Sequence, residues 1–199
     1  HGHGTMVGGL AVFGNVRACY EAGNFASPVT LFSARVLNDQ NEFDDEQLII
    51  NQMRTAIRTF VAAPHECRVF NLSLGAQRSV FENGNLRQTE WAEALDNLAR
   101  ELKVLLVVSA GNSPAADSNS PGDAETILQQ YPAIIFDPRA RLSDPGTAAL
   151  AITAGSLVEH DVPAVRHGAD RNDIVHPVGQ RNQPAPFTRT GPGISNGIK

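Results

Sequence analysis

Residues 104–112 read VLLVVSAGN, and this stretch decides the fold. It begins with five apolar residues, three of them valine, which predict a buried strand because the run is short and β-branched. An almost continuously apolar strand is typical of a parallel sheet that helices cover on both faces. The sequence SAGN places small and polar residues at the carboxyl end of this strand, where such sheets usually carry their functional groups.

The segments around this strand alternate between strands and helices. Strands are predicted over 29–36 and 68–74, and amphipathic helices over 44–62 and 88–102. A further apolar strand is predicted over 148–154. This alternation indicates an α/β fold with a mainly parallel sheet flanked by helices, which right-handed crossovers connect.

Three other regions complete the predicted layout. Residues 5–13 (TMVGGLAVF) predict a buried helix of small residues that stops at Gly14 and Asn15. A short helix is predicted over 124–130, and the aperiodic residues 157–186 predict a surface loop or insertion. With 199 residues, 42% of them hydrophobic, the chain is expected to form one folded domain.

Composition and charge argue against several classes of protein. The formal net charge is −5 and Lys and Arg form no cluster, so the electrostatic footprint of nucleic-acid binding is absent. No apolar run approaches the roughly 18 residues that predict a membrane span. Cys19 and Cys67 lie far apart, and we interpret them as free thiols. Sparse cysteines favour a cytoplasmic compartment only weakly, because the N-terminus resembles a cut end and a leader cannot be read.

Three short motifs stand at the ends of predicted elements. His3 precedes Gly4 and Thr5 at the first turn of a helix, where an imidazole can exchange a proton near neutral pH. Ser73-Leu74-Gly75 ends one strand, and Ser109-Ala110-Gly111-Asn112 ends another. Exposed backbone and a small residue at a strand end suit an edge with which an extended peptide can pair.

In this order, the three motifs resemble those of the subtilisin-like serine peptidases, the subtilase family. The resemblance implies a three-layer subtilisin-like fold and a serine endopeptidase with an Asp-His-Ser triad. It implies that His3 is the catalytic base and that the side chain of Asn112 donates to the oxyanion. It also implies two substrate-binding edges, made of Ser73, Leu74 and Gly75 and of Ser109, Ala110 and Gly111.

Two more segments extend the resemblance over nearly the whole chain. Residues 145–156 look like a later core strand of the family, and residues 186–193 (PFTRTGPG) are similar to its Phe-Ser-x-x-Gly-Pro stretch. In the family an Asp precedes the His on a strand, and a Ser follows at a Gly-Thr-Ser helix start. Neither of these two segments is matched here, so we expect a central part of a peptidase domain that is incomplete at both ends and inactive by itself.

Two short matches are interpreted as accidental. Gly146-Thr147-Ala148 looks like Gly-Thr-Ser with alanine in place of the nucleophile. It runs directly into the strand predicted over 148–154 and precedes Phe187, whereas the family's nucleophile follows that stretch. Asn71-Leu72-Ser73 matches the glycosylation triplet but lies in a strand that is expected to be buried.

The residues leave alternative functions open. The main alternative is a non-catalytic subtilase-fold module that binds a peptide or protein, although such a module needs neither His3 nor Asn112. A nucleotide-binding domain is disfavoured because the glycine-rich run over 2–9 follows no strand.

No cofactor is predicted from the sequence. His1 and His3 lack a third ligand at metal-site spacing, and the acids of residues 161–173 match no EF-hand loop, so a structural calcium ion is not predicted either. The expected partner is a peptide or protein substrate, not nucleic acid or a membrane. An incomplete sheet is also expected to self-associate through its exposed edges.

Overall fold

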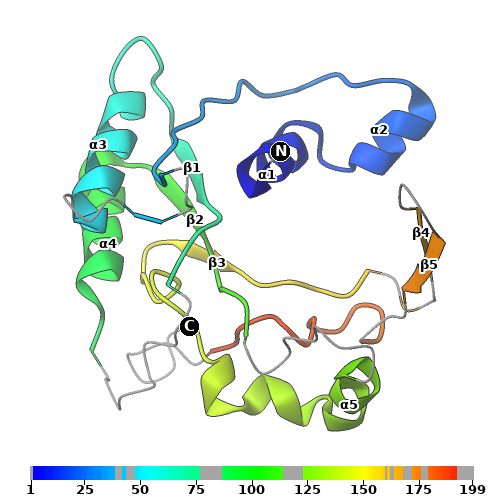
Figure 1. Cartoon of the computed structure of the whole chain (residues 1–199). Coiled ribbons are helices and arrows are strands. Elements are labelled where there is room, and N and C mark those ends of the chain that lie inside the picture. The colour runs from blue at the N-terminus through cyan, green and yellow to red at the C-terminus, as the bar shows by residue number, and fades with distance from the viewer. Residues whose placement is uncertain are drawn as a thin grey trace. The chain divides into compact units, whose positions relative to one another are not determined.

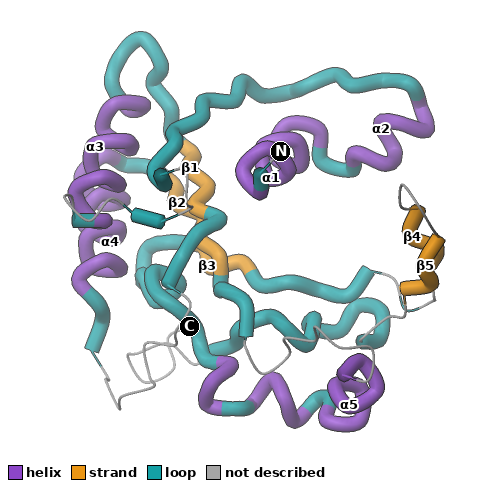
Figure 2. Tube along the Cα trace, in the orientation of Figure 1, coloured by secondary structure: helices purple, strands orange, loops and turns teal. Residues whose placement is uncertain are grey.

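The computed structural model describes residues 2–38, 42–43, 48–76, 87–113, 123–159, 161, 164–167, 172–175 and 179–191. The chain forms two compact units, His1–Arg68 and Val69–Lys199, and each is described by itself. Figure 1 labels their helices and strands, and Figure 2 separates helices, strands and loops by colour.

The first unit opens with two helices, α1 (His3–Phe13) and α2 (Val16–Ala22). The helix predicted over 5–13 is confirmed, and it ends where expected, at Gly14 with a φ of +63°. Asn15 then caps α2 by accepting a hydrogen bond from the Ala18 amide at 3.0 Å.

The prediction that this first helix is buried is wrong. No residue of α1 is buried, and Met6 and Leu10 are 63% and 58% exposed. Within its unit α1 contacts α2, and the Leu31 side chain approaches Gly8, where an added Cβ would lie 3.2 Å from it. These neighbours cover only part of a helix that is apolar around its whole circumference.

The third helix, α3 (Ile49–Val61), confirms most of the helix predicted over 44–62, of which residues 44–47 lie outside the described part of the chain. Its buried side chains, Met53 and Ile57, are four residues apart and therefore share one face.

The strand predicted over 29–36 is wrong. These residues adopt no regular structure, and Val29 and Leu31 are exposed. Phe32 instead stacks against the rings of Phe60 and His65, with centroid distances of 5.7 and 4.8 Å. A β-branched segment becomes a strand only when another strand pairs with it, and here side-chain contacts hold the segment instead.

The second unit contains a parallel sheet of three strands in the order β1-β2-β3. The strands are β1 (Val69–Leu72), β2 (Leu105–Ser109) and β3 (Ile152–Ala154). They confirm, with shorter bounds, the strands predicted over 68–74 and 104–109 and the end of the one over 148–154. With the helices around it, this sheet makes the chain an α/β protein, as its sequence predicts.

The two faces of the sheet differ in burial. Leu72 pairs in register with Val108, and both are buried on the same face as Leu106. The opposite face carries the exposed side chains of Leu105 and Ile152. The described sheet therefore buries one apolar face.

Helix α4 (Glu90–Leu102) contacts β2, and the two run beside each other in Figure 1. It confirms the helix predicted over 88–102. Thr89 caps its start by accepting a hydrogen bond from the Ala92 amide at 3.2 Å. Its buried apolar side chains follow helical spacing: Trp91, Ala92, Ala94, Leu95, Leu98 and Ala99.

A buried carboxylate fixes α4 to the segment before β3. Asp96 is only 7% exposed, and its oxygens accept hydrogen bonds from the side-chain amide of Gln88 at 2.5 Å and from the amides of Ala149 at 2.9 Å and Leu150 at 2.7 Å. All three donors lose their acceptor together if this carboxylate is removed.

Asp96→Asn is expected to lower the free energy of unfolding by about 1–3 kcal/mol, because an amide at this buried position turns an N–H group toward at least one of the three donors. Chemical denaturation of the two purified proteins measures this difference. Glu93→Gln, on the exposed side of the same helix, is the control and should change little. Equal stability of the Asp96→Asn variant and the native protein would contradict this role.

The remaining elements follow β2 and β3. They are α5 (Asp123–Gln130), which confirms the helix predicted over 124–130, two 3-10 helices, η2 (Ala133–Phe136) and η3 (Pro138–Ala140), and the antiparallel pair β4 (Ala164–His167) and β5 (Asn172–Val175). The pair corrects the prediction of a loop over 157–186. Its strands have four residues each and pair Arg166 with Asp173, so they carry no clear apolar alternation.

Candidate functional site

The first predicted substrate edge, Ser73-Leu74-Gly75, directly follows β1. The Asn71 side chain donates a hydrogen bond to Ser73 Oγ at 2.9 Å, and the Ala76 amide donates to the Asp144 carbonyl at 2.8 Å. At Gly75 an added Cβ would lie 2.7 Å from that same carbonyl. A glycine is therefore required here for the close approach of the two backbones.

The second predicted edge, Ser109-Ala110-Gly111, follows β2. Ala110 is buried and its amide donates to the Ala154 carbonyl at 2.9 Å, while the Gly111 amide binds Ser109 Oγ at 3.0 Å. Gly111 has a φ of +91°, a conformation that favours glycine. Since β1 and β2 are parallel neighbours, the two predicted edges leave adjacent strands at the same end of the sheet.

A turn over 143–146 connects these two edges. The Ser143 side chain donates to the Ala110 carbonyl at 3.3 Å, and the Gly146 amide donates to the Ser143 carbonyl at 2.7 Å. Asp144, in the same turn, accepts from the amide of Ala76 beyond the first edge. This turn was missed from the sequence because most of its contacts are made by backbone groups. Gly146-Thr147-Ala148, interpreted as accidental, begins at the last residue of this turn and does not lie at a helix start.

Asn112, the predicted oxyanion donor, follows Gly111 in the chain and is exposed. Its backbone forms an antiparallel bridge with Thr188, and the following amide of Ser113 donates to the Phe187 carbonyl at 2.7 Å. The Asn112 carbonyl accepts from Arg189 Nε at 2.9 Å. The peptide that carries this side chain is thus fixed on both sides.

Arg189 lies next to the predicted site and was not identified from the sequence. It is 2% exposed, and its Nη1 donates to the carbonyls of Arg139 and Arg141, both at 2.8 Å. The only sequence signal is one charged residue within the otherwise uncharged stretch PFTRTGPG.

His3, the predicted base, is the first residue of α1 and is exposed. It belongs to the first unit, whereas both predicted edges and Asn112 belong to the second. The structure therefore brings the two edges and the Asn112 peptide together within the second unit. His3 lies in the first unit and is described separately from them. His1 lies outside the described residues.

The carboxyl group of Asp144 lies next to the first edge and is largely buried. Burial raises the pKa of this carboxyl, and a hydrogen bond from the Thr89 hydroxyl at 2.5 Å partly offsets the rise. A raised pKa means that folding favours the protonated form. The stability contributed by Asp144 is therefore fully present below about pH 4, the ordinary carboxyl range, and is lost as the pH rises through the raised pKa.

Asp144→Asn is expected to raise the free energy of unfolding at pH 7, because the amide oxygen keeps the Thr89 hydrogen bond without the buried charge. The gain should disappear near pH 4, where the native carboxyl is itself protonated. Denaturation of both proteins at the two pH values measures this, with the exposed Asp161→Asn as control. A gain of equal size at both pH values would contradict the assignment.

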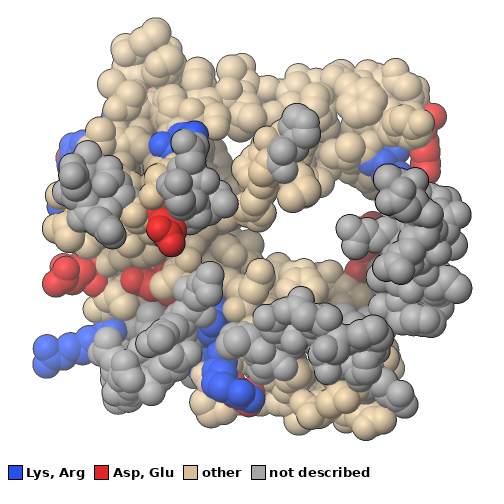
Figure 3. Space-filling model, in the orientation of Figure 1, with Lys and Arg blue, Asp and Glu red and all other residues tan. Residues whose placement is uncertain are grey.

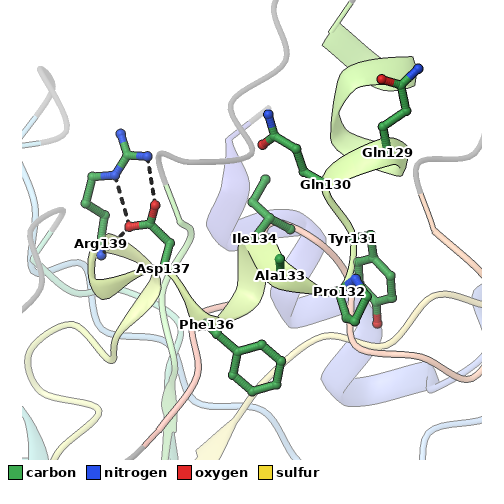
Figure 4. Close-up of a pocket in the computed structure, with 9 residues that line it drawn as sticks. All are labelled: Gln129, Gln130, Tyr131, Pro132, Ala133, Ile134, Phe136, Asp137 and Arg139. Atoms are coloured by element: carbon green, nitrogen blue, oxygen red, sulfur yellow. Dashed lines mark hydrogen bonds and ion pairs between the residues drawn. The ribbon is translucent and has the colours of Figure 1, made fainter.

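A separate shallow pocket of about 470 Å³ lies beside α5 and the 3-10 helices, lined by residues 129–134, Phe136, Asp137 and Arg139. Figure 4 shows Arg139 folded back on Asp137, with an ion-pair distance of 2.9 Å. The hydrogen bond from Arg139 lowers the pKa of the Asp137 carboxyl. None of the predicted site residues lines this pocket.

Two further findings concern metals and charge. Within the described ranges, no group of three or more His, Cys, Asp or Glu side chains is placed to hold a metal ion. Of residues 161–173, residues 162–163 and 168–171 lie outside those ranges. On the face drawn in Figure 3, Lys and Arg side chains occur singly or in small groups between uncharged residues.

None of the described helices is long and apolar enough to cross a membrane.

The family model for subtilases (peptidase S8) matches residues 1–199. The "Uncharacterized protein y4bN" of Sinorhizobium fredii is 38% identical over 150 residues, which are 75% of this chain and 33% of that protein. No solved structure matches the chain.

A small parallel sheet with helices around it defines an α/β protein. The chain belongs to the subtilase family, a family of serine peptidases. It spans about a third of the length of the curated relative that it matches.

Proposed function

We propose that the protein hydrolyses peptide bonds, with His3 as the general base and Asn112 as the donor to the oxyanion. The observation that carries this proposal is the exposed Asn112, on a peptide that hydrogen bonds fix from two sides. Its place at the carboxyl end of β2, next to the first edge, supports the same role.

The proposed mechanism uses four side chains: His3, Asn112, a serine and an aspartate. His3 removes the proton from a serine hydroxyl as that oxygen attacks the substrate carbonyl, and an aspartate orients the imidazole. The side-chain N–H of Asn112 donates to the carbonyl oxygen as it becomes negative. We propose that the aspartate and the serine come from parts of the polypeptide outside residues 1–199, so that this chain alone is inactive.

Substrate is proposed to bind as an extended strand between the two edges. Ser73-Leu74-Gly75 is proposed to offer backbone groups on one side. On the other side Ser109-Ala110-Gly111 is proposed to offer carbonyl oxygens, because the Ala110 and Gly111 amides already donate within the protein. Because β1 and β2 are neighbours in one sheet, their ends lie close enough for one peptide backbone to reach both.

The test is to incubate the full-length protein that contains this chain with a mixture of unstructured peptides and to identify products by mass spectrometry. We expect new amino and carboxyl termini, and we expect the 199-residue chain alone to produce none. A folded full-length protein that leaves all peptides intact would contradict the proposal.

A non-catalytic peptide-binding module is the second candidate. One observation favours it: both edges and the turn over 143–146 lie within the second unit, so peptide binding does not require His3. The same incubation separates the candidates, because a binding module retains peptides without shortening them.

A further inference from the structure

Arg189 carries a buried charge that the proposed mechanism does not use. Its guanidinium donates to three backbone carbonyls, those of Asn112, Arg139 and Arg141, at 2.8–2.9 Å. Hydrogen bonds from a charged donor are among the stronger ones in proteins, and the planar fork of arginine suits several acceptors at once. Burying a guanidinium costs free energy, so its N–H groups need hydrogen-bond acceptors.

These three bonds connect separate segments of the second unit. The Arg189 amide donates to the Gly111 carbonyl at 3.2 Å, so backbone and side chain of Arg189 both bind the segment after β2. Its neighbour Thr190 donates to the Ala140 carbonyl at 2.8 Å and accepts from the Leu142 amide at 3.1 Å. The side chain of Arg189 therefore fastens the Asn112 peptide to the segment over 139–142.

Gly111 provides the space for this arrangement. An added Cβ would lie 2.9 Å from Arg189 Cδ and would also collide with Ser143 Oγ. Both residues of the Gly111-Asn112 sequence therefore contribute: Gly111 leaves space for the Arg189 side chain, and the Asn112 carbonyl accepts its hydrogen bond.

We infer that Arg189 is a positioning residue for Asn112. It holds the Asn112 carbonyl, while the Phe187 carbonyl holds the next amide, so the direction of the side-chain amide is set by the fixed peptide that carries it. Arg189 acts through Asn112 and does not itself touch the substrate. This inference rests on the proposed function of Asn112.

The test is a double-mutant cycle in the full-length protein, with Arg189→Lys and Asn112→Ala. Lysine keeps the charge but not the fork, so Arg189→Lys is expected to lower kcat on the order of 10- to 100-fold and to change KM less than about threefold. In the Asn112→Ala background, the same change is expected to alter kcat less than about threefold, because no side-chain amide is left to position. Arg181→Lys, on an exposed turn, is the matched control.

Two results would overturn the assignment: an unchanged kcat in folded Arg189→Lys, or a loss of the same size with and without Asn112. The second result would show that Arg189 only stabilises the fold. If Arg189→Lys does not fold, Arg189→Gln replaces it in the cycle, because its side-chain amide keeps N–H donors without the charge or the guanidinium fork. Absence of cleavage by the native protein contradicts the proposed function together with this assignment, whereas cleavage with an unchanged variant contradicts the assignment alone.

Discussion

Replacing His3 by alanine in the full-length protein is expected to lower kcat for peptide hydrolysis on the order of 10⁶-fold, which is the magnitude known for the same loss in subtilisin, a member of this family. Alanine cannot take the proton from the serine, so the attacking oxygen remains a neutral, weak nucleophile. Peptide cleavage at saturating substrate measures the effect.

The control for this change is Met6→Ala on the same helix. Met6 is exposed, as is His3, so neither substitution removes a buried contact. Both variants should retain the circular dichroism spectrum of the native protein. A His3→Ala variant that cleaves within about tenfold of the native rate would contradict the assignment of the base, because general acid–base catalysis alone contributes at least about 10²-fold.

Replacing Asn112 by alanine is expected to lower kcat about 10²- to 10³-fold with little change in KM, again the magnitude known from subtilisin for loss of one oxyanion donor. The donor acts mainly in the transition state, which is why KM changes little. Asn112 is exposed and its backbone carbonyl, which binds Arg189, is kept, so stability should change little.

The variant Asn112→Asp tests the same role of the side-chain N–H more directly. It keeps the shape of the side chain but replaces the N–H donor by a carboxylate oxygen, which repels the developing negative charge. We expect it to be at least as impaired as Asn112→Ala in kcat measured on the same peptide. An aspartate variant with native kcat would show that Asn112 donates no hydrogen bond in the reaction.

The strands and the helix of the second unit were predictable from local pattern. The run VLLVVS has the length and β-branching of a strand, and Trp91, Leu95 and Leu98 repeat at helical spacing, so β2 and α4 follow from sequence. The positions of the two proposed substrate edges were predictable for a related reason: the small and polar residues after β1 and β2 stand where parallel strands end.

Elements that depend on distant partners were not predictable. Residues 29–36 have strand composition, but the contacts of Phe32 with Phe60 and His65 hold them in an irregular path. The composition of α1 predicts burial, yet burial depends on which neighbours surround the helix. The pair β4 and β5 was missed because the strands are short and their register pairs polar residues such as Arg166 and Asp173.

The contacts that support the proposed site could not be predicted from the sequence, for a different reason. Arg189 and the turn over 143–146 act through backbone carbonyls and amides, which every residue possesses. A sequence pattern can mark a side chain that donates to an oxyanion. It gives no sign of which carbonyl a buried arginine reaches across a long stretch of chain, as Arg189 reaches Asn112.

Labelling of the full-length protein by a serine-directed fluorophosphonate tests the account most directly, because the reagent reacts only with an activated serine. The native protein is expected to be labelled, and the His3→Ala variant and the 199-residue chain alone are expected to remain unlabelled. Absence of labelling in a well-folded native protein, or equal labelling of the His3→Ala variant, would contradict a serine peptidase in which His3 is the base.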